Sequence, residues 1–146
     1  GLPSALLGEL DTGAAASQVK TNKQAEITRM TPNGRTKLST HVLDLVSGLP
    51  APGLAVKLYD PEDALISSAI TNEDGRIEAW DGAVDLGSGT YRLVFDIAGY
   101  RQTHGASEHD LLFPRIEIIF HLDGSRSRLH IPVLLSNYGY TTYRGS

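Results

Sequence analysis

The sequence of 146 residues contains no cysteine. Disulfide bonds, thiolate metal sites and a thiol nucleophile are therefore excluded. The missing disulfides leave the compartment open, because proteins of oxidising compartments can also lack them. A chain of this length can form one domain whose core is large enough to be stable without covalent cross-links.

Clustered positive charge is also missing. The formal net charge is -4, and the lysines and arginines form no basic run. This argues against nucleic acid as a partner, because binding to a phosphate backbone relies on several clustered cations. We therefore expect no nucleic-acid partner.

Long apolar runs are absent as well. No run approaches the roughly 18 residues that span a bilayer, which argues against a membrane partner. The short apolar stretch at the start is followed directly by Glu9 and Asp11, which is unlike a signal peptide. We expect a soluble, cytoplasmic protein. A peroxisomal or periplasmic location is left open, because a signal that had already been cleaved would not be visible.

Residues 1–36 differ from the rest of the chain in composition. Small and polar residues dominate, with Gly13-Ala-Ala-Ala-Ser17 at the centre and Thr31-Pro-Asn-Gly34 near the end. A marginal helix could span residues 18–30, but it lacks the apolar surface that would stabilise it in isolation. We interpret residues 1–36 as a flexible tail, an interdomain linker or residues foreign to the domain, which itself spans 37–146.

The domain shows the two-residue period of β-strands. Apolar and polar residues alternate in the segments 37–44, 54–59, 64–71, 90–97, 115–122 and 129–135, and a last strand carries Tyr138, Tyr140 and Thr142. Turn signals separate these segments, while residues 98–107 break the period and predict one or two helical turns. The pattern predicts an all-β fold, a two-sheet β-sandwich of seven or eight strands with one short helix.

Two histidines on predicted strands and one arginine after a turn are candidate site residues. His41 lies on the strand face opposite Val42, and His130 points away from the apolar face of its strand. Arg76 follows Asp74-Gly75, a strong turn signal. Taken singly, such residues are more often structural or solvated than functional. Three further histidines lack the spacing and carboxylate partners of a metal site, so we interpret them as surface residues and expect no metal: His104, His109 and His121.

Three separated motifs change this interpretation. They are Leu38-Ser-Thr-His-Val-Leu-Asp44, Asp74-Gly-Arg76, and a C-terminal signature of His130-Ile-Pro132, Tyr138-Gly-Tyr140 and Tyr143-Arg-Gly-Ser146. Together, within residues 37–146, they resemble the 5-hydroxyisourate hydrolases, the enzymatic branch of the transthyretin family. The resemblance implies a transthyretin-like topology and a homotetramer with active sites at the interface between dimers. It also implies cofactor-free hydrolysis of the cyclic amide of 5-hydroxyisourate to 2-oxo-4-hydroxy-4-carboxy-5-ureidoimidazoline, a step in urate degradation.

The resemblance assigns roles to individual residues. The catalytic positions are His41, Arg76, His130 and Ser146, and the substrate-binding positions are His41, Arg76, Tyr143, Arg144 and Gly145. Amide hydrolysis needs an activated water, stabilisation of an oxyanion and a proton for the departing nitrogen. We assign Arg76 to substrate anchoring and oxyanion stabilisation, because guanidinium stays charged. The two histidines share water activation and proton transfer, with either as the general base. Ser146 offers a hydroxyl and a terminal carboxylate.

The chain departs from the family pattern at three positions. Arg128 stands where the family usually has a second histidine, Arg115 where it has glutamate, and Asn137 where it has proline. These changes could alter substrate affinity or pH optimum but leave the three core residues intact.

Two other functional classes stay open: a carrier of a small aromatic ligand without catalysis, and an interaction module. Residues 1–36 could also link the domain to the decarboxylase of the next step, to which such hydrolases are fused in some organisms.

Overall fold

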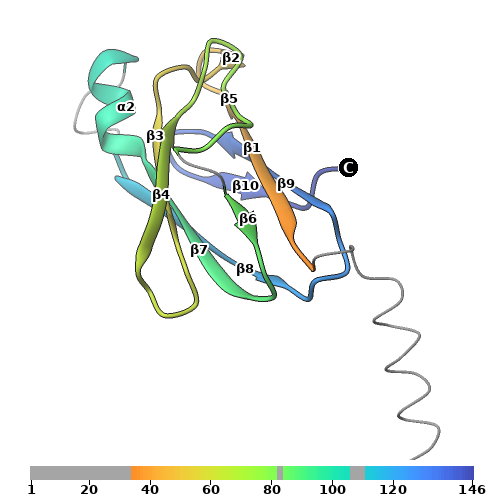
Figure 1. Ribbon diagram of the computed structural model, residues 1–146. Helices are drawn as coiled ribbons and strands as arrows, with labels where there is room; N and C mark the ends of the chain where they lie inside the picture. The colour runs from red at the N-terminus through yellow and green to blue at the C-terminus, as the bar shows by residue number, and fades with distance from the viewer. Residues whose placement is uncertain (1–33, 82–83, 106–110) are drawn as a thin grey trace, which may run out of the picture.

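The computed structural model describes residues 34–81, 84–105 and 111–146, which Figure 1 draws in colour. Most of the expected tail at residues 1–36 lies outside the described residues, as does His109. Within these ranges the chain forms ten strands and one α-helix. The described part contains no helix that is long and apolar enough to cross a membrane.

The strands form a six-stranded and a four-stranded sheet. The larger sheet contains β1 (Thr36–Asp44), β2 (Leu49–Pro50), β5 (Arg76–Ile77), β6 (Asp85–Leu86), β9 (Arg128–Leu135) and β10 (Tyr140–Thr142). Its order is β10-β9-β1-β2, and β5 and β6 also pair with β1. The smaller sheet has the order β4-β3-β7-β8 and contains β3 (Ala55–Tyr59), β4 (Leu65–Ile70), β7 (Gly89–Asp96) and β8 (Arg115–Leu122). β1 and β9 pair in parallel, whereas β1 pairs antiparallel with β2, β5 and β6.

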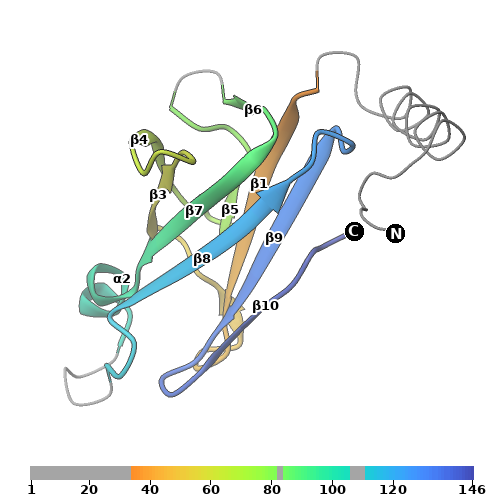
Figure 2. The same cartoon turned by 90° about the horizontal axis from the view of Figure 1, so that it is seen from below.

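Figures 1 and 2 show the two sheets as facing layers. The core lies between them because each long strand turns alternate residues inward. The larger sheet contributes Leu38, Val42, Leu129, Ile131 and Val133, and the smaller sheet contributes Val56, Leu58, Leu93, Phe95 and Ile116. This arrangement confirms the predicted two-sheet β-sandwich.

The short strands and the helix start differ in detail from the sequence prediction. Seven of the strands in the described residues contain three or more residues, in agreement with the predicted seven or eight. β2, β5 and β6 have two residues each, too few to give a periodic signal. The helix α2 spans Ile97–Thr103 rather than 98–107. It begins one residue early because the Asp96 carboxylate accepts a hydrogen bond from the Gly99 N–H at 3.0 Å and caps the helix.

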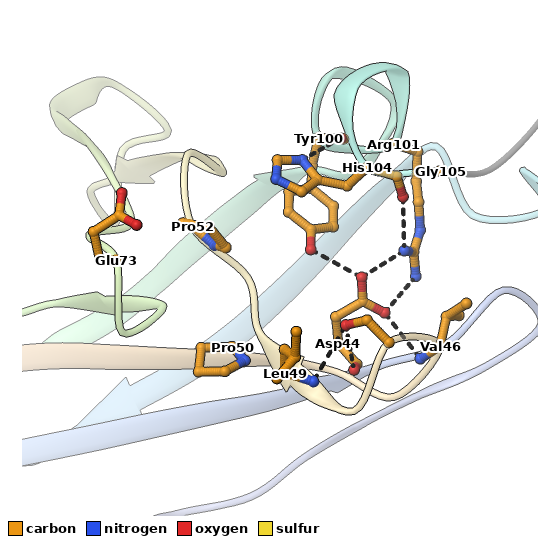
Figure 3. A pocket seen from close by; sticks show the side chains of 11 residues that line it. Asp44, Val46, Leu49, Pro50, Pro52, Glu73, Tyr100, Arg101, His104 and Gly105 are labelled. Carbon is orange, nitrogen blue, oxygen red and sulfur yellow. Dashed lines mark hydrogen bonds and ion pairs between the residues drawn. The ribbon is translucent and has the colours of Figure 1, made fainter.

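A buried ion pair connects the end of β1 to α2, beside a cavity of about 570 Å³ (Figure 3). Arg101 donates to the two carboxylate oxygens of Asp44 at 2.6 and 3.0 Å, and the Tyr100 hydroxyl donates to Asp44 at 2.8 Å. The side chains of Arg101 and Asp44 are 4% and 2% exposed. Burial alone would raise the pKa of Asp44, but the hydrogen bonds from Arg101, Tyr100 and the Val46 N–H outweigh it and lower the pKa. Asp44 is therefore an ionised anchor between β1 and α2.

We expect Arg101→Met to lower the free energy of unfolding by about 3–5 kcal/mol, because it leaves a buried carboxylate without its cation. Urea denaturation measures this loss. The difference from wild type should shrink below about pH 4, since ionised Asp44 stops stabilising the wild type as pH falls through its lowered pKa. Arg92→Met is the matched control, because Arg92 pairs with Asp63 and Glu117 near the surface, where solvent weakens an ion pair, and its loss should cost much less than that of Arg101. Equal losses in both variants would contradict the anchoring role.

Candidate active site

Three strands of the larger sheet place His41, Arg76 and His130 on its outer face. β1 and β9 pair with Ser39 opposite His130 and His41 opposite Pro132. On the other side of β1, His41 lies opposite Arg76 of β5. His41, Arg76 and His130 are all half-buried, and they alternate with buried residues of the same strands. The two histidines therefore face outward, as the period of their strands predicts.

The turn before β5 holds Arg76 close to β1. The Asn72 side chain accepts hydrogen bonds from the N–H groups of Asp74 at 2.9 Å and of Arg76 at 3.0 Å. Gly75 has a φ of 73°, and its carbonyl accepts a hydrogen bond from the Val42 N–H at 2.8 Å. A Cβ at position 75 would overlap the carbonyl oxygen of Val42. Glycine is required here for both the positive φ and the close approach.

The final segment of the chain, residues 143–146, lies against His130. The Gly145 N–H donates to the His130 carbonyl at 2.8 Å, and the two residues form an antiparallel bridge. The Thr142 hydroxyl donates to the Pro132 carbonyl at 2.9 Å and ties down the start of this segment. A Cβ at Gly145 would lie 2.5 Å from Cδ2 of His130 and 3.1 Å from Cγ of Pro132. The absence of a side chain at position 145 therefore lets the backbone lie directly on the imidazole.

The environment of His130 favours a neutral imidazole. Burial lowers the pKa of His130, and electrostatic interactions with Arg76 and His41 lower it further, while Glu78 acts in the opposite direction. An imidazole that is neutral near pH 7 has one nitrogen that can accept a proton and one that can donate a hydrogen bond. A fixed guanidinium beside two imidazoles can hold a negatively charged oxygen and exchange protons with water or a substrate.

The structure brings four of the predicted site residues into one group: His41, Arg76, His130 and Gly145. Tyr143, Arg144 and Ser146 belong to the same final segment, but their side chains are exposed. The sequence prediction missed Ser39, whose Oγ lies 2.7 Å from Nδ1 of His130. Its position two residues before His41, on the same strand face, is the signal that could have identified it.

The described residues also contain a smaller cavity and two further histidines. Lys37 and Glu78 line a cavity of about 220 Å³ together with Trp80 and Asp85. No group of three His, Asp or Glu side chains in the described ranges could hold a metal ion. As predicted, the remaining described histidines are exposed: His104 stacks on Tyr100, and His121 contacts Thr90.

We expect His130 to titrate below the ordinary histidine value of 6.5. Replacing Arg76 with methionine should raise the pKa of His130, because a nearby positive charge that disfavours the imidazolium is removed. Ring-proton NMR over a pH series measures both values. Arg92→Met removes a cation from the smaller sheet and should leave His130 unchanged. A His130 pKa that is identical in wild type and Arg76→Met would show that the two side chains do not interact.

Comparison with known proteins places this geometry in a family. Residues 38–145 match the model of the HIUase/Transthyretin family. A "5-hydroxyisourate hydrolase 2" of Rhizobium meliloti is 43% identical over 123 residues, covering 80% of this chain and 100% of the relative. The curated 5-hydroxyisourate hydrolase of Mus musculus is 38% identical over 114 residues, covering 75% of this chain and 94% of the relative.

Solved structures have the same fold. The 5-hydroxyisourate hydrolase of Klebsiella pneumoniae superposes with a TM-score of 0.65 at 34% identity, covering 75% of this chain and 98% of that one. An (S)-allantoin synthase has a TM-score of 0.66 at 29% identity, but the match covers 77% of this chain and only 44% of the synthase. Sea bream transthyretin in complex with thyroxine has a TM-score of 0.65 at 26% identity, covering 75% and 94% of the two chains.

The family match extends over most of the described residues and includes every strand of the sandwich from within β1 to β10. It also includes the three half-buried residues on the outer face and the glycine that contacts His130. On this evidence the chain belongs to the HIUase/Transthyretin family.

Proposed function

We propose that this protein is an enzyme that hydrolyses 5-hydroxyisourate to 2-oxo-4-hydroxy-4-carboxy-5-ureidoimidazoline in urate degradation. The observation that carries the proposal is the grouping of His41, Arg76 and His130 on one sheet face, with Gly145 against His130. Relatives that are 38–43% identical are curated as 5-hydroxyisourate hydrolases. These hydrolases and the chemistry of the face support an enzyme over a carrier of a small aromatic ligand.

The reaction assigns a task to each of the three side chains. Water adds to the carbonyl carbon of the cyclic amide, and the carbonyl oxygen becomes an oxyanion. The carbon–nitrogen bond then breaks, and the nitrogen takes a proton. Arg76 anchors the substrate oxygens and stabilises the oxyanion, because its charge is permanent. His41 and His130 divide the removal of the proton from water and the delivery of a proton to nitrogen.

The terminal residues complete the site in this proposal. Gly145 fixes the segment by its main-chain bond to His130. Tyr143 and Arg144 precede it and supply side chains that bind the substrate, and Ser146 follows it and acts with the histidines in catalysis. Because Tyr143 is 54% exposed, its ring can contact a substrate that lies on the outer face.

A homotetramer is part of the same proposal. Several large apolar side chains of the larger sheet and its loops are exposed in the single chain, among them Leu45 at 56%, Leu49 at 63% and Tyr138 at 66%. Exposed apolar groups of this size commonly mark contact with another protein surface. A second protomer over the outer face would also exclude water from around Arg76 and strengthen its interaction with an oxyanion.

We also propose that residues 37–146, together with Thr36 at the start of β1, form the catalytic domain and that the preceding residues are a tail or linker. A linker could couple the hydrolase to the decarboxylase that follows it in the pathway. The (S)-allantoin synthase supports such an arrangement, because this chain covers 44% of it and the fold therefore occurs within a longer enzyme.

Arg76→Glu should lower kcat/KM for 5-hydroxyisourate at least about a hundredfold, because it replaces the cation that stabilises the oxyanion with a repelling charge. Ultraviolet absorbance of freshly generated substrate, with and without protein, measures the rate. Lys57→Glu makes the same change on the exposed face of the smaller sheet and should keep wild-type activity. Wild-type turnover by Arg76→Glu would remove Arg76 from the mechanism.

Treatment with a chelator should not change the hydrolysis rate of the wild type, because the proposed reaction uses no metal. Loss of activity that a divalent cation restores would contradict a metal-free reaction.

Deleting Tyr143 to Ser146 should lower the hydrolysis rate at least about a hundredfold while assembly persists, because positioned groups beside His130 are lost. Gly145→Ala should lower the rate at least about tenfold, since its Cβ would lie 2.5 Å from the His130 ring. Gly139→Ala is the matched control, because a Cβ there meets only Ser136 Oγ at 3.8 Å. Sedimentation velocity tests assembly. A truncated protein with the parent rate would exclude the final segment from catalysis.

A further inference from the structure

We propose that Ser39 is a positioning residue: its hydroxyl donates to Nδ1 of His130 and holds the ring with Nε2–H directed toward the substrate. The functional part of this inference rests on the proposed hydrolysis. The structural part stands on the contact itself, which joins residues 91 positions apart in the sequence. Such a contact would also separate the tasks of the two histidines.

The backbone holds both partners of the contact in place. β1 and β9 pair at every position from Lys37 with Arg128 to Asp44 with Leu135. Ser39 and His130 lie opposite each other in this register and turn to the same outer face. Their Oγ–Nδ1 distance of 2.7 Å is a normal hydrogen-bond length. One ring nitrogen of His130 is therefore bound by β1, while Nε2 has no hydrogen-bond partner among the described residues and can meet a ligand.

The hydroxyl selects a tautomer of the neutral ring. In the part of the chain that the structure describes, His130 Nδ1 is the single hydrogen-bond partner of Ser39 Oγ, so donation to Nδ1 satisfies the hydroxyl proton. A neutral imidazole that accepts at Nδ1 carries its hydrogen on Nε2. His130 is then the hydrogen-bond donor to a substrate oxygen. His41 is left as the imidazole that accepts the proton of water.

A neutral hydroxyl suits the charges around His130. The charged and titratable residues on the elements around it are Lys37 and His41 on β1, Arg76 and Glu78 in and after β5, Arg128 on β9, and Tyr143, Arg144 and Ser146 in the final segment. A carboxylate in place of the Ser39 hydroxyl would favour the imidazolium and place a hydrogen on Nδ1. A hydroxyl orients the same ring without adding a negative charge, and it can accept from Nδ1–H if the ring becomes protonated.

The test combines tautomer and rate measurements on the full chain. Nitrogen-15 NMR of labelled histidine should show His130 of the wild type protonated at Nε2 and unprotonated at Nδ1. Ser39→Ala should give a mixture of tautomers and lower kcat about tenfold, with KM changed less than about twofold. Ser39→Thr, which keeps the hydroxyl, should restore the tautomer and most of kcat. Ser39→Asp should raise the pKa of His130 in a ring-proton NMR titration, because a carboxylate beside Nδ1 favours the imidazolium.

Thr90→Ala is the matched control, since Thr90 makes the same kind of contact with His121 Nδ1, at 3.0 Å on the smaller sheet. It should leave kcat and the pH profile unchanged. A Ser39→Ala protein with the wild-type tautomer and the wild-type kcat would overturn the inference. The NMR result needs no substrate, so it decides the positioning role even if the wild type fails to hydrolyse 5-hydroxyisourate. Circular dichroism and the Ser39→Thr variant separate this role from loss of folding.

Discussion

The parallel pairing of β1 with β9 determines where the groups of the candidate site lie. Parallel neighbours cannot be joined by a tight turn, and the smaller sheet and α2 lie between these two strands in the sequence. Side chains alternate strictly, so a slip of one residue in β9 would turn His130 into the core and Leu129 into solvent. The apolar alternation of both strands therefore fixes the register. The ion pair of Asp44 with Arg101 adds a polar anchor at the end of β1.

Local patterns predict the long strands well, because the two-residue period is visible within each segment. β8 has the predicted bounds of 115–122, and the outward positions of His41 and His130 follow from the same period. The two-residue strands could not be predicted in this way. β6 forms because Leu86, which is 3% exposed, packs in the core, and that contact depends on distant parts of the chain. The start of α2 depends on a side-chain cap by Asp96, which the period assigns to the preceding strand.

The residues of the candidate site also differ in whether local sequence patterns can predict them. The motifs identify His41, Arg76 and His130 without any knowledge of register, because each lies in its own recognisable stretch. The partnership of Ser39 with His130 could not be predicted, since it requires knowing that β1 and β9 are parallel neighbours with these two residues opposite. The exposed side chains of Tyr143, Arg144 and Ser146 show a further limit: a single chain presents these groups on an open face, and sequence motifs do not say what covers them.

Two residues without side chains restrict how this site can change in evolution. At position 75 a Cβ would overlap the backbone of β1, and at position 145 it would press on the ring of His130. Neither glycine has a functional group, yet drift at either would displace Arg76 or the imidazole while every reactive side chain stayed in the sequence. Descendants of this protein could therefore lose the arrangement and still retain all the motif residues that bear chemistry. A search for the His, Arg and Ser residues alone would wrongly class such a chain as having an intact site. Checking whether positions 75 and 145 are still glycine would detect the loss.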